Sequence, residues 1–182
     1  MKKVLIAGLL GGIVLFVWTA ISWMGIRPFI MDVKPLPNAD VVLEQFADAE
    51  SGLYMHPTEE MEGWEEAYAS GPRITFMVFH PDGKDPFAPS MFIYGLILNI
   101  IAASIVAYIL ALACEATVRL VRYGTRVNFV VLFGVFLSVM ADLTNLNYWD
   151  FPAELIFLNV FDNIITWALV GSVLAWRIQP PK

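Results

Sequence analysis

Four long apolar runs alternate with polar segments along the chain. The apolar runs cover residues 4–24, 91–114, 128–148 and 153–176, and each is long enough to cross a bilayer as a helix. A much longer polar segment separates the first run from the second. The pattern predicts an all-α membrane protein with four transmembrane helices and a small α+β domain outside the bilayer.

The expected boundaries follow from where each apolar run stops. We assign residues 1–25 to the first helix, 26–90 to the outside domain, 91–114 to the second helix, 115–127 to a loop and 128–177 to a helical hairpin. The first run is too long for a signal-peptide core, so a retained helix is favoured over cleavage. The four apolar runs themselves contain no Lys or Arg.

Basic residues predict the orientation. The loop carries Arg119, Arg122 and Arg126, and the two terminal segments are also basic. Because cytoplasmic segments are enriched in Lys and Arg, we expect both termini to lie inside, with residues 26–90 in the periplasm. The expected location is therefore the bacterial inner membrane.

The outside domain contains signals for two helices and two strands. Helices are expected over 39–50 and 59–69, and strands over 52–56 and 73–80. The second helix carries an acidic surface, which suits a basic periplasmic protein, although a solvated helix face is the commoner meaning of such a run. That surface consists of Glu59, Glu60, Glu62, Glu65 and Glu66.

The hairpin carries acidic and amide side chains at membrane depth. Helical spacing places Asp142 roughly 10 Å and Asp162 roughly 16 Å below the turn between the two helices. The residues expected to form one intramembrane polar cluster are Asp142, Asn145, Asn159, Asp162 and Asn163.

Neither aspartate has an obvious cation within these boundaries. A carboxyl buried without a cation is expected to be protonated and to act as hydrogen-bonding glue between helices. Two alternatives stay open: a basic or polar group from another subunit, and a proton or cation pathway.

Small residues recur at four-residue spacing in three of the helices. Such stripes allow helix backbones to approach closely. The residues expected at helix contacts are Gly8, Gly12, Ala103, Ala107, Ala111, Gly134 and Ser138.

Composition narrows the functional classes. The chain has 182 residues, of which 58% are hydrophobic and only 15% charged, with a net charge of −6. Without clustered Lys and Arg, a nucleic-acid partner is excluded.

The single cysteine, Cys114, is expected to pack between helices, with palmitoylation as the alternative. A metal site at His56 and His80 would require the two strands to bring them together, and surface histidines are favoured.

No catalytic motif is present, so catalytic residues, metals and cofactors are not expected.

The order of four helices, with a large outside segment carrying Gly52-Leu53-Tyr54 after the first helix, resembles the claudin plan. This chain lacks the paired cysteines of claudins, so the resemblance implies arrangement alone. The predicted function is an accessory subunit that binds other membrane subunits and lipid. The alternative is a small homo-oligomeric transporter or channel with Asp142 and Asp162 in its path.

Overall fold

The structure, a computed structural model, describes residues 1–180 and is mostly helical. Four of its helical stretches are long and apolar enough to cross a membrane: Lys2–Ile30, Pro89–Ala116, Tyr123–Trp149 and Ala153–Arg177. The four predicted spans are therefore present, and the chain has the character of a multi-pass membrane protein.

Two of the spans contain a wider π-helical turn. The first span consists of α1 (Lys2–Ala20), η1 (Ile21–Ile26, π-helical) and α2 (Arg27–Ile30). The third consists of α6 (Tyr123–Leu137), η3 (Ser138–Asp142, π-helical) and α7 (Leu143–Trp149). The second and fourth spans are the unbroken helices α5 (Pro89–Ala116) and α8 (Ala153–Arg177).

The first helix is longer than predicted. Pro28 occupies the first turn of α2, just after the π-helical turn η1. Proline is tolerated in a first turn, where its missing N–H would have no helical partner. Helical structure therefore continues to Ile30 and includes Arg27.

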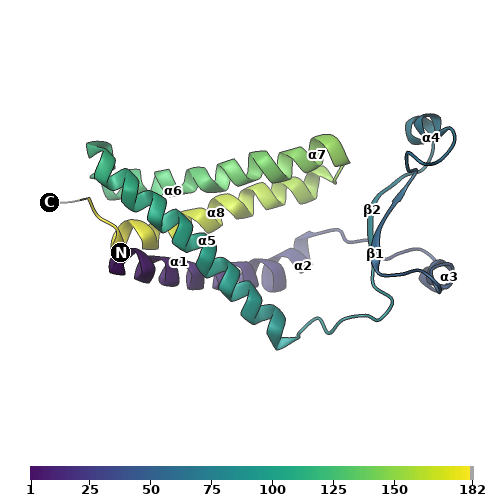
Figure 1. The fold of residues 1–182 in the computed structure, drawn as a ribbon, viewed down its shortest axis with the longest axis horizontal. Coiled ribbons are helices and arrows are strands. Elements are labelled where there is room, and N and C mark those ends of the chain that lie inside the picture. Colours follow the sequence, from purple (N-terminus) through teal and green to yellow (C-terminus); the bar gives the residue numbers. More distant parts are fainter. Residues whose placement is uncertain (181–182) are drawn as a thin grey trace. The chain divides into compact units, whose positions relative to one another are not determined.

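One compact unit contains all four spans, residues 1–31 and 87 onward. Within it, α1 packs against α5 and α8, and α6 packs against α8. The start of α1 and the end of α8 lie at the same end of the bundle as the end of α5 (Figure 1). We call this the Arg126 end, and the opposite one the Arg27 end.

Glycines permit the close contact between α1 and α5. A methyl group added to Gly8 would lie 2.7 Å from the Cα of Ser104, and one added to Gly12 would lie 2.8 Å from the backbone nitrogen of Ile100. Gly134 makes a similar approach between α6 and α8, where an added methyl would lie 2.8 Å from the carbonyl oxygen of Asn163. Three of the predicted contact residues thus lie where no side chain fits.

The other predicted contact residues are also in packed positions. Ala103 and Ala107 of α5 are fully buried, Ala111 packs at the edge of the same apolar core, and Ser138 is buried at the start of η3. Cys114 belongs to this core and is only 4% exposed. Its burial fits a packing role and leaves the sulfur poorly placed for acylation.

The second compact unit comprises residues 32–86. Strands β1 (Gly52–His56) and β2 (Ile74–Phe79) pair antiparallel, with Gly52 opposite Phe79 and His56 opposite Ile74. Both predicted strands are present. The helices α3 (Ala39–Glu44) and α4 (Trp64–Ser70) are shorter than predicted, since turns occupy residues 45–48 and 59–63.

Candidate functional site

Arg27 lies at the centre of a buried polar network. Its side chain is 4% exposed, and its Nη2 donates to Asp162 Oδ2 over 3.0 Å. Nη1 donates to Asn159 Oδ1 at 2.7 Å, and Nε donates to Ser22 Oγ at 3.3 Å. The guanidinium carbon also lies 4.2 Å from the ring centre of Trp23. All three side-chain nitrogens of Arg27 therefore donate hydrogen bonds to other residues of the chain.

Asp162 accepts hydrogen bonds from the first span as well. Trp18 Nε1 donates to Oδ1 at 2.8 Å, and Ser22 Oγ donates to Oδ2 at 3.0 Å. The prediction that Asp162 lacks a cation is therefore wrong, because Arg27 lies in a helix and not in the outside domain. With a charged partner and two further donors, Asp162 is held as a carboxylate acceptor.

Asn159 links the two aspartates. Arginine can only donate, so the carbonyl oxygen of Asn159 must face Arg27 and its amide nitrogen must point away. That nitrogen donates to Asp142 Oδ1 at 3.2 Å. Asn163 Nδ2 donates to the other oxygen of Asp142 at 2.8 Å, and also to Ser138 Oγ at 3.2 Å. Both oxygens of Asp142 are thus acceptors, and its donors are neutral amides.

We call these eight residues the polar cluster: Trp18, Ser22, Arg27, Ser138, Asp142, Asn159, Asp162 and Asn163. The structure brings together four of the five residues grouped from the sequence. Asn145 contributes differently: its carbonyl oxygen accepts from the backbone nitrogen of Phe151 and closes the turn after α7.

Sequence reasoning missed the contribution of the first span. Trp18 and Ser22 are four residues apart, but Arg27 follows Ser22 by five, which is the spacing of a π-helical turn. A search at α-helical spacing does not join these three side chains. One feature of the sequence could have pointed to this contribution: Arg27 lies only two residues beyond the expected end of the first helix.

A cleft of about 420 Å³ adjoins the polar cluster. All four spans contribute to its wall. The polar lining residues are Thr19, Arg27, Asn99, Asp142, Asn159, Asp162, Asn163 and Thr166. The apolar and aromatic ones are Leu15, Trp23, Ala102, Leu137, Ala141 and Trp167. Small-molecule sites are usually lined mainly by apolar residues. Polar residues outnumber apolar ones in this cleft, so its lining suits a polar or charged ligand with some hydrocarbon.

A second buried arginine stabilises the opposite end of the bundle. Arg126 is 5% exposed, and its Nη1 donates to the carbonyl oxygens of Leu120 at 2.9 Å and Val121 at 2.6 Å. Its Nε and Nη2 both donate to the carbonyl oxygen of Ala175, at 3.2 and 3.0 Å. Assigning Arg126 to a loop was wrong, because α6 begins at Tyr123.

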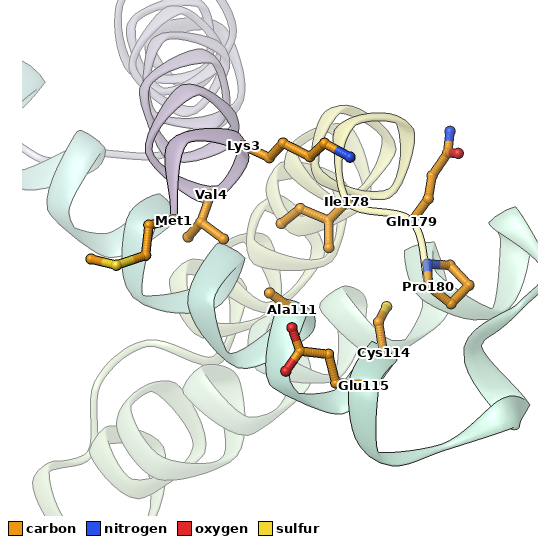
Figure 2. A pocket seen from close by; sticks show the side chains of 9 residues that line it. All are labelled: Met1, Lys3, Val4, Ala111, Cys114, Glu115, Ile178, Gln179 and Pro180. Atoms are coloured by element: carbon orange, nitrogen blue, oxygen red, sulfur yellow. The ribbon is translucent and has the colours of Figure 1, made fainter. Parts of the chain in front are cut away.

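A second cavity of about 400 Å³ lies at the Arg126 end. Figure 2 shows that its side chains come from the start of α1, the end of α5 and the segment after α8. Its charged lining residues are Lys3 and Glu115, and Cys114 contributes a buried sulfur. Among the residues that the structure describes, this cavity has one charged side chain of each sign and no buried polar network among its lining side chains.

The predicted acidic surface is exposed. Glu59, Glu60 and Glu62 lie in turns before α4, and Glu65 and Glu66 lie in its first turn, where they complement the positive end of the helix dipole. The strand register places His56 beside the start of β2, while His80 follows its end. The two histidines therefore do not meet, and the described residues contain no cluster of His, Cys, Asp and Glu suited to a metal.

Comparison of the chain with family models, with curated proteins and with solved structures finds no match.

Proposed function

We propose that the chain is an accessory subunit of a larger bacterial inner-membrane complex and binds a basic partner through residues 32–86. The supporting observation is an apolar strip on one face of the β1–β2 ribbon. Leu53 is 59% exposed, Val78 opposite it 66%, and Met55, two residues further along β1 on the same face as Leu53, 39%. Lipid accounts for exposed apolar side chains on the four spans, but these residues belong to the other compact unit.

The ribbon has one covered face and one open face. On the covered face, the ring centre of Phe46 lies 5.4 Å from that of Tyr54 and 5.2 Å from that of Phe79. A two-stranded ribbon is marginally stable in water by itself and needs packing on its apolar surface. A partner on the open face would supply that packing.

The charge of the unit favours a basic partner. Residues 32–86 contain twelve acidic and three basic side chains, a net charge of −9. An anionic lipid surface repels such a unit, whereas a basic protein surface is attracted to it in a salt-dependent way. The five glutamates around α4 would guide the encounter, and the apolar strip would hold the complex.

The orientation that fits this proposal places both termini in the cytoplasm. Arg119 and Arg122 lie in the short connection between the end of α5 and the start of α6, and Lys2 and Lys3 lie in the first turn of α1, so these basic residues are at the Arg126 end. The positive-inside rule expects such basic residues on a cytoplasmic face. A cysteine substituted at position 66 should react with an impermeant reagent added outside. Labelling only from the cytoplasmic side would reverse the orientation.

The partner is tested by purifying the tagged chain from its native membranes in mild detergent and identifying associated subunits by mass spectrometry. We expect a stoichiometric basic partner that is lost when Leu53→Glu and Val78→Glu are combined. Val41→Glu is the matched control, because Val41 is 60% exposed in the same unit but lies on α3. Recovery of the wild-type chain alone, as a homo-oligomer, would contradict the proposal.

A small transporter is the second candidate, favoured specifically by the polar cleft within the spans. Reconstitution into sealed vesicles would distinguish it from the accessory role. Flux that needs no other subunit and disappears with Asp142→Asn would favour transport.

A further inference from the structure

The charges beside the cleft do not balance within the chain. Arg27 pairs with Asp162 at 3.0 Å, so these two charges offset each other. Asp142 is 7% exposed, and its two amide donors carry no charge. One negative charge therefore remains beside the cleft, in surroundings where an unpaired charge is costly. A cation in the cleft would remove that cost.

The cleft also contains polar groups without partners. Thr166 is 8% exposed and lines the cleft, and its hydroxyl group makes no hydrogen bond within the part of the chain that the structure describes. Asn99 lines it from α5 and is likewise without a hydrogen bond among those residues. Both side chains can accept as well as donate hydrogen bonds. These two groups are therefore available to a ligand.

Both π-helical turns border the same cleft. η1 contributes Trp23 to its wall, and η3 contributes Ala141 and Asp142. Such turns interrupt regular α-helical hydrogen bonding and are found frequently at functional sites. Their occurrence on two different spans at one cavity is an observation independent of the charge imbalance.

Cleft size and lining indicate the class of ligand. At about 420 Å³ the cleft is much larger than one water, which occupies roughly 30 Å³ in the liquid, so a bare metal ion would leave most of it empty. Leu15, Leu137 and Trp167 offer apolar and aromatic wall to a hydrocarbon group. An anion is disfavoured by the remaining negative charge.

From these observations we propose that the cleft binds a small organic cation, a primary ammonium with a short hydrocarbon body. The ammonium group pairs with Asp142, Thr166 and Asn99 accept its other N–H groups, and the hydrocarbon lies against the apolar wall. This site goes beyond the proposed accessory role, and it names the class of molecule that the chain would carry if it were a transporter. Binding can be measured without transport, so the binding proposal and the transport proposal can be refuted independently.

The test is isothermal titration calorimetry on the full chain in lipid nanodiscs, which have no sealed compartment and report binding alone. Butylammonium chloride is the probe, and sodium chloride and 1-butanol are the comparison titrants. We expect one saturable butylammonium site per chain, at least tenfold weaker with Asp142→Asn. Glu154→Gln is the matched control, because Glu154 is an exposed carboxylate in the first turn of α8, the other helix of the hairpin that carries Asp142, and lies outside the cleft.

A folding defect is separated from a binding defect by gel filtration and circular dichroism. If Asp142→Asn does not fold, Thr166→Val removes one acceptor and leaves the carboxylate, and we expect it to weaken binding several-fold. Absence of saturable binding to the wild-type chain would overturn the proposal. So would unchanged binding in a folded Asp142→Asn, or displacement of butylammonium by an equal concentration of sodium.

Discussion

Two arginines, each more than nine-tenths buried, stabilise opposite ends of this bundle by different means. Arg126 donates four hydrogen bonds, all to backbone carbonyl oxygens. Arg27 donates only to side chains, those of Ser22, Asn159 and Asp162. Backbone acceptors are present whatever the sequence, whereas side-chain acceptors exist only because particular residues occupy those positions.

The difference shows where the molecule can respond to a ligand. The carbonyl oxygens around Arg126 cannot be titrated, and Ala175 lies in the last turn of α8, where a cation also complements the helix dipole. At the Arg27 end, two carboxylates, three amides and a cleft lie together. A bound cation would change the energy balance there and leave the Arg126 end untouched.

The largest effect is expected from removing Arg27. Arg27→Ala leaves Asp162, which is 16% exposed, without its cation, and we expect this to cost about 3 to 5 kcal/mol. Arg126→Ala leaves neutral carbonyls without a donor, at a smaller cost of about 1 to 3 kcal/mol. Thermal unfolding of both variants in the same detergent measures the difference.

Removing both members of the Arg27 pair provides the control. Combining Arg27→Met with Asp162→Leu should be less destabilising than Arg27→Ala alone, because neither charge is left uncompensated. If Arg126→Ala proved the more destabilising single change, the backbone contacts would be the stronger of the two, and our comparison would be wrong.

An intermediate effect is expected between α1 and α5. Gly12→Ala places a methyl group against the backbone of Ile100, the neighbour of Asn99 in the cleft wall. Separating the helices there should cost about 1 to 3 kcal/mol and disturb the Arg27 end. Gly25→Ala is the control, because nothing lies within 4 Å of the added methyl group, and its effect should stay within about 1 kcal/mol. Equal melting temperatures for the two variants would contradict close packing at Gly12.

The sequence predicted those features that depend on hydropathy and regular spacing. The four spans and the two strands followed from apolar runs and residue type. Asp142, Asn159 and Asn163 were grouped by helical spacing alone. Arg27 was missed because the first helix was ended with the apolar run at residue 25, and because a π-helical turn changes the spacing that would have joined Arg27 to Ser22. The cleft depends on how four helices pack together, and residue spacing along a single helix carries no information about that packing.

The smallest effect is expected from Asp142→Asn. The new side chain offers one oxygen where the carboxylate offered two, so Asn159 or Asn163 loses an acceptor. It also removes the remaining negative charge beside the cleft, and that gain opposes the loss. We expect a net change in the free energy of unfolding below about 1 kcal/mol. Asp142→Leu removes both acceptors and should cost about 1 to 3 kcal/mol.

Chemical denaturation of the two Asp142 variants in parallel measures this difference, and the oligomeric state of Asp142→Asn decides its meaning. If Asp142→Asn stays in its complex and keeps normal stability, the role of Asp142 is to accept hydrogen bonds and to bind the cation in the cleft. Dissociation of Asp142→Asn from a larger complex would assign the countercharge to a basic residue on another subunit, because the lost partner would leave that residue buried and uncompensated at about 3 to 5 kcal/mol. The ligand site and the subunit contact thus predict opposite results for one conservative substitution.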